Sequence, residues 1–234
     1  MDKTRPHLVF SKNPARRAAE RFHASRFLHG YAKRKAMWDP AYAAAASMLR
    51  GSSLPLLDIG CGIGLLAAYL RECGCSQPIT GIEPDAGKVR AGRELVASYY
   101  QNLDFHIGDV RSLPEFSGDI VVLDVLHYMA PAELEAAMES LSARIAPGGR
   151  AIIRTAFRDS SWRYFATLAE EAFVRASGWI RGGRCHFHSR QEIEKLFVSP
   201  SFSLDVRPMW GKTPFNSHLI EVRRLQSKCV SSCE

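Results

Sequence analysis

Short apolar runs alternate with amphipathic segments along most of this chain. Apolar residues in the segments between the runs recur at helical spacing. The runs expected to be strands are 54–59, 78–83, 103–107, 119–124 and 151–155, and the expected helices are 65–71, 86–100 and 131–145. Because strands that alternate with helices form right-handed βαβ units, the pattern predicts a parallel sheet covered by helices.

The segment before this alternation predicts helices only. Residues 14–35 are expected to form one helix, whose apolar side includes Ala18, Ala19, Phe22, Phe27 and Leu28. A second helix is expected from Pro40 to about Leu49, because Asp39 is a good N-cap and proline is favoured at the first helical position. We expect residues 1–53 to form a basic helical cap on the domain that follows.

The C-terminal segment predicts a helix and two strands. Ser189 to Glu192 is a capping box that opens a short helix to Phe197. Runs at 203–210 and 218–225 are joined by a loop containing Gly, Pro and Asn, which indicates an antiparallel hairpin. Residues 226–234 predict a frayed tail.

A glycine-rich turn follows the first predicted strand. Gly60, Gly62 and Gly64 stand at alternate positions, where glycine allows positive φ and close approach of a ligand. Backbone N–H groups at the start of the next helix can bind a polar group. A dinucleotide-binding turn reads G-x-G-x-x-G, whereas here Asp58 stands two residues before the first glycine. A carboxylate there would repel a pyrophosphate and attract an ammonium group.

Acidic residues also stand at the ends of the next three predicted strands. Glu83 ends the second, where a carboxylate can accept hydrogen bonds from both hydroxyl groups of a ribose. The alternative for Glu83 is an ordinary surface acid. Asp109 follows the third strand and Asp124 ends the fourth. Because the carboxyl ends of parallel strands meet at one edge of a sheet, we expect these side chains to surround one ligand.

The D-x-G-x-G-x-G pattern and these acids resemble class I S-adenosylmethionine (SAM) methyltransferases over about residues 54–225. The resemblance implies an α/β fold, namely a Rossmann-like, doubly wound, seven-stranded and mainly parallel sheet with a C-terminal antiparallel hairpin. It also implies SAM as cofactor, with Asp109 near the adenine amino group. The implied cofactor-binding residues are Asp58, Gly60, Cys61, Gly62, Glu83, Asp109, Val110, Asp124 and Val125.

Four residues are candidates for the chemistry of methyl transfer, which needs a positioned acceptor and, for an oxygen or carbon acceptor, a group that takes up a proton. His127 follows the fourth strand and is the first candidate general base or substrate contact, with Tyr128 beside it. A structural histidine is an equal alternative. His186 and His188 are candidates to contact substrate, and we expect no metal site because no matching ligands accompany them.

Residues 157–188 are longer than a simple connection and are expected to form a helical lid. The apolar residues at helical spacing are Trp162, Phe165, Ala169, Ala172, Phe173 and Ala176, with arginines around them. We expect an aromatic-lined substrate pocket here. One alternative is a helix whose apolar face covers the core, and another is an amphipathic helix at a membrane surface.

Three shorter stretches, 29–33, 161–163 and 210–216, resemble methyltransferases encoded with bacterial aryl-polyene pigment pathways. This resemblance implies a small or acyl-carrier-protein-bound acceptor of aromatic or polyene type. It also implies that Tyr31 and Lys35 close over the carboxylate of the cofactor.

Positive charge is concentrated at the N-terminus. Residues 1–35 hold ten Lys and Arg residues against Asp2 and Glu20, a net charge of +8 in a chain whose total is +7. Such a segment can meet an acidic carrier protein, an anionic membrane or nucleic acid, or it can be a solvated helix face. Only this charge suggests nucleic acid, which we therefore do not expect.

Composition bounds the remaining choices. A chain of 234 residues with 46% apolar residues can bury the core of one α/β domain. No apolar run approaches the roughly 20 residues of a membrane span, and without a secretory signal pattern we expect a cytoplasmic location. The leading prediction is a SAM-dependent methyltransferase. Alternatives are an RNA or protein methyltransferase, a non-catalytic SAM- or carrier-binding protein and, least favoured, an NAD-dependent dehydrogenase, which the glycine spacing opposes.

Overall fold

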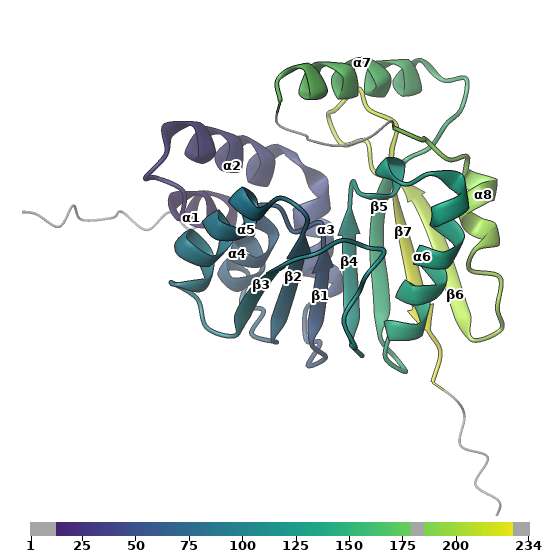
Figure 1. Cartoon of the computed structure of the whole chain (residues 1–234), viewed down its shortest axis with the longest axis horizontal. Coiled ribbons are helices and arrows are strands. Elements are labelled where there is room, and N and C mark those ends of the chain that lie inside the picture. Colours follow the sequence, from purple (N-terminus) through teal and green to yellow (C-terminus); the bar gives the residue numbers. More distant parts are fainter. Residues whose placement is uncertain (1–12, 179–184, 227–234) are drawn as a thin grey trace, which may run out of the picture.

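The computed structural model describes residues 13–178 and 185–226, and its strands form one seven-stranded sheet in the order β3-β2-β1-β4-β5-β7-β6 (Figure 1). The first five strands of this order pair in parallel, and β7 pairs antiparallel with both β5 and β6. The strands are β1 (Leu56–Ile59), β2 (Ile79–Glu83), β3 (Leu103–Ile107), β4 (Asp119–Leu123), β5 (Arg150–Ala156), β6 (Phe202–Pro208) and β7 (Ser217–Arg224). The predicted fold, including the C-terminal antiparallel hairpin, is confirmed.

Helices cover both faces of the sheet (Figure 1). One face carries α1 (Pro14–Glu20), α3 (Pro40–Met48), α4 (Leu65–Glu72) and α5 (Ala86–Gly92), which continues as a π-helix over Arg93–Ala97. The other face carries α6 (Pro131–Arg144) and α8 (Arg190–Lys195). Neighbouring residues of each strand enter opposite cores: Leu56 and Val121 pack with the first group of helices, whereas Leu57 and Val122 pack with the second. This burial on both faces explains why the strands read as continuous apolar runs.

The N-terminal segment differs from the single helix expected over residues 14–35. It forms α1 and then α2 (Arg26–Trp38), with a turn between them in which Phe22 is fully buried. Ser25 caps α2, because its hydroxyl accepts a hydrogen bond from the Leu28 N–H at 3.3 Å. The expected apolar side is also corrected at Phe27, which is 65% exposed. The prediction of α3 with Asp39 as its N-cap is confirmed.

The order of the strands places a ligand edge at the carboxyl ends of β1 and β4. These parallel strands are neighbours at the point where the strand order reverses: from β1 the chain goes to β2 and β3 on one side, and then to β4 and β5 on the other. Such a switch point leaves a crevice in open α/β sheets. The two loops pack closely here, because a Cβ on Gly60 would lie 2.4 Å from Val125 Cγ2. Both α2 and α7 (Trp162–Ala176) lie over this edge (Figure 1).

The lid helix α7 does not turn its apolar side to the sheet. Trp162, Phe165 and Phe173 are 63%, 61% and 73% exposed, so the interpretation of a helix whose apolar face covers the core is wrong. The polar side faces inward instead. Thr167 is buried there, and its hydroxyl accepts a hydrogen bond from the Asn216 N–H at 2.9 Å.

Candidate active site

Asp58 is the most unusual group at the ligand edge. It lies on β1, two residues before Gly60, and only 3% of it is exposed. Its carboxylate makes no hydrogen bond within the described parts of the chain, and Oδ2 is fully buried. Burial, aided by the nearby Glu83 carboxylate, raises the pKa of Asp58 from 3.8 to about 7. A cationic group placed at this carboxylate would relieve the cost of its burial.

The glycine turn differs from the expected one because the N–H groups of its glycines are not free to bind a ligand. Its N–H groups are already used, because Gly60 donates to the Ile82 carbonyl at 2.7 Å and Gly64 donates to the Cys61 carbonyl at 3.0 Å. Gly62 donates to Glu83 Oε2 at 3.1 Å. Gly62 nevertheless has a φ of +56° and open space where a Cβ would stand. A ligand can therefore approach the backbone at Gly62, next to Glu83, although the N–H groups of the three glycines already have acceptors.

Glu83 holds the turn and keeps acceptor capacity. It is 7% exposed at the end of β2. Its Oε2 accepts the Gly62 N–H, and its Oε1 accepts the Asp85 N–H at 3.2 Å. A carboxylate has about four acceptor positions, so two remain for a diol. The Lys88 ammonium group lies 3.9 Å from Oε1.

The remaining residues of the predicted cofactor edge fall into two groups. Asp109 is held by its neighbour: it accepts hydrogen bonds from the Arg111 N–H at 2.8 Å and from Arg111 Nε at 3.0 Å, which lower its pKa. Val110 and Cys61, by contrast, are buried in the two cores, and burial raises the pKa of the Cys61 thiol. The structure thus gives Cys61 and Val110 packing contacts and leaves Asp109 at the surface.

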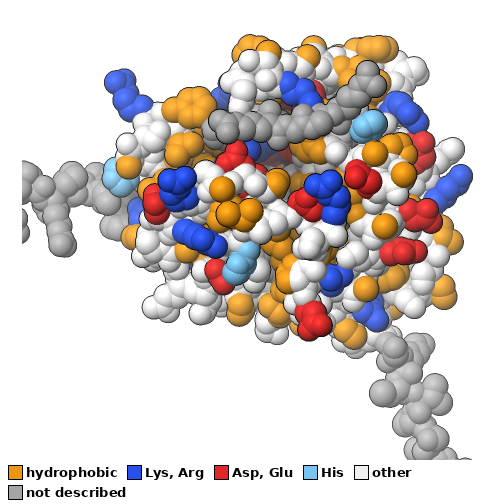
Figure 2. All heavy atoms as spheres, viewed as in Figure 1, with side chains coloured by type: hydrophobic (Ala, Val, Ile, Leu, Met, Phe, Trp, Pro, Cys, Tyr) orange, Lys and Arg blue, Asp and Glu red, His pale blue; other side chains and the backbone are white. Residues whose placement is uncertain are grey.

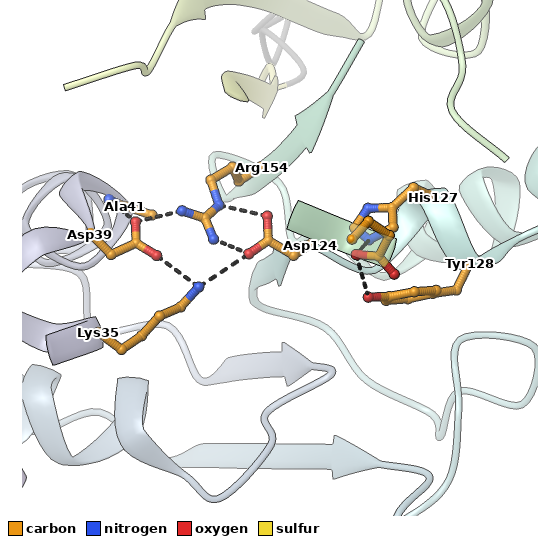
Figure 3. A network of polar contacts seen from close by, with 8 residues as sticks. Lys35, Asp39, Ala41, Asp124, His127, Tyr128 and Arg154 are labelled. Atoms are coloured by element: carbon orange, nitrogen blue, oxygen red, sulfur yellow. Dashed lines mark hydrogen bonds and ion pairs between the residues drawn. The ribbon is translucent and has the colours of Figure 1, made fainter. Parts of the chain in front are cut away.

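An ionic cluster joins the N-terminal helices to the strand ends (Figure 3). Arg154, on β5 and 6% exposed, donates through Nε to Asp124 Oδ1 at 2.7 Å and through Nη2 to Asp124 Oδ2, and it also donates to Asp39. Lys35 Nζ lies 3.0 Å from Asp39 Oδ2 and 3.4 Å from Asp124 Oδ2. Burial raises the pKa of Asp39, but the two neighbouring cations outweigh burial and bring the pKa down to about 2.

Three residues predicted to bind the cofactor lie in or near this cluster, and two of them, Asp124 and Lys35, have ionic partners in it. Asp124 has a φ of +60°, a conformation that is costly for a residue with a Cβ, and its bidentate pair with Arg154 holds it there. The ammonium group of Lys35 lies between two carboxylates, and Tyr31 packs partly buried against the first core. Their predicted contact with the cofactor stays a prediction.

His127 and Tyr128 meet the lid under α7. Glu171, on α7, accepts a hydrogen bond from the Tyr128 hydroxyl at 3.4 Å, and its Oε2 lies 3.9 Å from His127 Nε2. Burial lowers the pKa of His127 to about 4, although the Glu171 carboxylate opposes this shift. His127 is therefore a neutral imidazole at pH 7, and its buried Nδ1 has no hydrogen-bond partner among the described residues.

The lid also supplies groups that the sequence did not single out. Glu171 Oε1 accepts hydrogen bonds from Arg175 Nε and from the Cys185 thiol, both at 3.1 Å. Arg175 also lies 3.0 Å from Cys185 Sγ. The only signal in the sequence is the i, i+4 spacing of Glu171 and Arg175 on the polar side of the lid helix.

His127, Glu171 and Cys185 lie close enough together to be metal ligands, with donor atoms within 4.8 Å of one another. The guanidinium group of Arg175, however, already supplies a positive charge at hydrogen-bonding distance from Glu171 and Cys185. Burial and Glu171 also raise the pKa of the Cys185 thiol to about 11, so it stays protonated. This donor set does not favour a metal, and the prediction of no metal site stays a prediction.

His186 and His188 are brought to the same region through the backbone. The His186 N–H donates to the His127 carbonyl at 2.7 Å, and the His188 carbonyl accepts from the Arg158 N–H at 2.9 Å. His188 is only 5% exposed, and burial lowers its pKa. Between them, the Phe187 ring stacks on the His127 ring at a centroid distance of 5.3 Å. His188 thus has the surroundings of a structural residue.

Two stretches of the finer resemblance pack together. The Arg163 guanidinium lies 4.7 Å from the Trp162 ring and 4.5 Å from the Trp210 ring, and Arg163 donates to the Thr213 carbonyl at 2.6 Å. Residues 161–163 and 210–216 therefore form one structural unit at the start of α7.

Cavity size does not identify the site by itself. A cavity of about 390 Å³ lies at the amino ends of β1 and β2, between residues 50–53 and 73–77, far from the groups described above. A smaller cavity of about 250 Å³ is lined by Ile63, Asp85 and Lys88, beside the glycine turn. We place the site at the turn because the unpaired carboxylate and the strand ends converge there.

Comparison with known proteins finds a match over the part of the chain that contains the glycine turn and the ends of β1, β2 and β4. Residues 56–149 match a family described as "Methyltransferase domain". The ribosomal protein L11 methyltransferase of Burkholderia ambifaria is 36% identical over 95 residues, which are 41% of this chain and 29% of that protein. The chain thus spans under a third of the length of this relative, and the match covers less than half of the chain.

Solved structures share the fold over most of the chain. Magnesium protoporphyrin IX methyltransferase from Synechocystis, with bound SAH, has a TM-score of 0.61 at 20% identity and covers 88% of this chain and 93% of its own. The cyclase SpnF has a TM-score of 0.63 at 15% identity, over 81% and 82% of the two chains. At these identities the likeness shows the fold alone. None of the described helices is long and apolar enough to cross a membrane.

The pKa of Asp58 predicts how stability depends on pH. Between about pH 4 and 7 the folded protein keeps a proton on Asp58 that the unfolded chain releases, so stability falls as the pH rises through this window. From pH 5 to pH 8 this fall is about 2–3 kcal/mol for the pKa shift involved. We expect Asp58→Asn to remove it, as measured by urea unfolding of both proteins at the two pH values. Equal pH dependence in the two proteins would contradict a raised pKa at Asp58.

Proposed function

We propose that this chain is a SAM-dependent methyltransferase whose cofactor binds at the carboxyl ends of β1, β2 and β4. SAM is the cofactor indicated by the methyltransferase-domain match and by the structural neighbour with bound SAH. The observation that carries the proposal is the buried Asp58 carboxylate, which has no partner among the described residues and lies near Glu83, the residue that accepts the Gly62 N–H. The amino-acid part of SAM brings the ammonium group that such a carboxylate needs.

The residues at this edge fit the other parts of the cofactor. Glu83 has two acceptor positions left for the ribose hydroxyls, and Asp109 has the acceptor that an adenine amino group needs. Lys35 is the cation for the cofactor carboxylate, which would compete with Asp39 and Asp124 for it. When bound, the cofactor supplies an activated methyl group.

We propose a small or carrier-bound acceptor of aromatic or polyene type. The support is a set of rings beside the end of β4: Phe187 stacks on His127, and Tyr164 meets Phe187 edge-on at 5.6 Å. The Tyr128 ring lies 4.2 Å from the His127 ring. Flat apolar groups pack well against such rings, and the buried Nδ1 of His127, which has no hydrogen-bond partner among the described residues, is a polar atom that a substrate hydroxyl would meet.

His127 is the residue proposed to take the proton from an oxygen acceptor. A neutral imidazole has one free acceptor nitrogen, and burial keeps His127 neutral above about pH 5. On methylation of the acceptor oxygen, with SAH as the leaving group, the hydroxyl proton would pass to that nitrogen, and His127 would become an imidazolium ion. Glu171, 3.9 Å away, stabilises that positive charge and is therefore a positioning residue.

A protein acceptor is the second candidate. It is favoured by the relatives named ribosomal protein L11 methyltransferase, which are matched over 95 residues. The match covers 29% of the length of those proteins, so most of their length lies outside the comparison. Labelled SAM, offered with purified L11 protein and separately with small aromatic acids, tells the two acceptors apart by where the label appears.

Calorimetric titration with SAH tests the cofactor site. We expect micromolar binding to the wild type and binding weaker by about 1–3 kcal/mol in Glu83→Ala, because a buried ribose would lose its acceptor. Glu83→Gln keeps one acceptor oxygen and should lie between the two. The exposed Glu94→Ala is a matched control that should bind as the wild type does. Binding of NAD in place of SAH would contradict the proposal.

Replacing the Glu171 carboxylate of the lid should lower kcat and leave cofactor affinity unchanged. Glu171→Gln removes the charge that stabilises a protonated His127, so we expect kcat to fall at least about tenfold with the SAH affinity within twofold. The exposed Glu139→Gln on α6 is the control, because it removes the same charge away from the lid and the strand ends. The rate of the wild type should fall on the acid side only below about pH 5, given the lowered pKa of His127. A fall near pH 6.5 would show that His127 is not the base.

A further inference from the structure

The outward face of α7 is a feature that the proposed methyl transfer does not use. Its apolar residues recur at positions 162, 165, 169, 172, 173 and 176, which lie along one side of a helix. Among them Trp162, Phe165 and Phe173 are each more than 60% exposed. The opposite side carries Thr167 and Glu171, which hydrogen-bond to the body of the protein. The helix is thus amphipathic, but its polar side faces the protein and its apolar side faces solvent, the opposite of a helix packed on a core.

A second helix on the same side of the molecule adds positive charge. Like α7, α2 lies above the strand ends (Figure 1), and it contains Arg26, Lys33, Arg34 and Lys35 but no acidic residue. Lys33 and Arg34 are exposed, and so is Trp38, at 65%. In the same view, Figure 2 shows hydrophobic side chains along the rim over α7, with Lys and Arg side chains near them.

We infer that this side of the protein docks on an anionic lipid surface, with the apolar face of α7 entering the headgroup region. Three observations favour lipid as the occupant. Trp and Phe on one face, with Lys and Arg close by, are the composition of interfacial helices. The exposed aromatic residues belong to two helices, with Trp38 on α2 and Trp162, Phe165 and Phe173 on α7, and apolar groups spread over two helices suit contact with an extended flat surface rather than with one peptide. The net charge of the chain, +7, complements anionic headgroups.

This inference does not depend on the proposed methyl transfer, since it uses none of the residues at the strand ends. The same side contains the lid over His127 and Tyr128. A docked protein would therefore present its candidate active site to molecules that partition into the membrane surface. Binding to vesicles can be measured without any acceptor or cofactor, so failure of either proposal leaves the other testable.

Co-sedimentation of the full chain with vesicles tests the inference. Vesicles of phosphatidylcholine and phosphatidylglycerol in equal parts should bind the protein, and vesicles of phosphatidylcholine alone should bind it at least about tenfold less. The double variant F165Q/F173Q should lower the partition coefficient about tenfold or more, because it removes the apolar groups that enter the headgroups. The variant K33Q/R34Q should lower it about tenfold and weaken its dependence on salt.

Two controls make the result decisive. Val198 is 83% exposed on the loop after α8, away from this side, so Val198→Gln should bind vesicles as the wild type does. Thermal unfolding of the double variant should match that of the wild type, because the two phenylalanines pack little in the folded state. Equal binding by F165Q/F173Q and wild type, or no binding to the anionic vesicles, overturns the inference. A wild-type dimer that F165Q/F173Q makes monomeric, without vesicle binding, overturns it in favour of a second copy of the chain.

Discussion

A carboxylate buried without a partner is the constraint on which this protein's functional edge depends. Asp58 cannot be moved to solvent, because it lies on the central strand β1 between β2 and β4. The cost of burying it appears as a pKa of about 7, nearly the pH of a cell. Glu83 adds a second negative group nearby, and two of its acceptor positions are occupied by the Gly62 and Asp85 N–H groups. The edge is therefore built to receive positive charge and hydrogen-bond donors, and it offers few donors of its own.

A second electrostatic unit fixes the walls of this edge. Arg154 and Lys35 neutralise Asp39 and Asp124, so the cluster carries no net charge and ties the junction of α2 and α3 to the ends of β4 and β5. The same pair with Arg154 holds Asp124 in a left-handed conformation. Because Lys35 is shared between two carboxylates, a carboxylate ligand could draw it away and loosen the hold of α2 on the strand ends. If the cofactor carboxylate meets Lys35 as proposed, cofactor binding and the position of α2 would be coupled through this one ammonium group.

The sequence predicted the parts of the site that depend on strand ends. The structure brings Asp58, Gly62 and Glu83 together, as the sequence predicts, because a strand, a glycine turn and an acid at the next strand end have a fixed order along the chain. Glu171 and Arg154 were missed as site groups because each reaches its partners from a distant element, and no local pattern encodes such a contact. The same holds for the break between α1 and α2, which depends on the burial of Phe22 in the tertiary structure.

The lid shows a related limit of sequence patterns. Helical spacing identified the apolar side of α7 but could not tell which way that side would face. That choice is made by Thr167 and Glu171, whose hydrogen bonds to Asn216 and Tyr128 turn the polar side inward. A hydrogen-bonded polar side facing the body leaves the aromatic side in solvent, which is costly unless a further surface covers it.

The most direct test of the central claim is the number of protons released when SAH binds. Calorimetry at pH 6 in two buffers of different ionisation enthalpy measures this number. If the ligand's ammonium group pairs with Asp58, the protein should release about 0.9 proton per SAH, because a group with a pKa near 7 is almost fully protonated before binding. Asp58→Asn should release none from this site. Equal proton release by the two proteins would show that the ligand does not meet Asp58, and the account of this edge would be wrong.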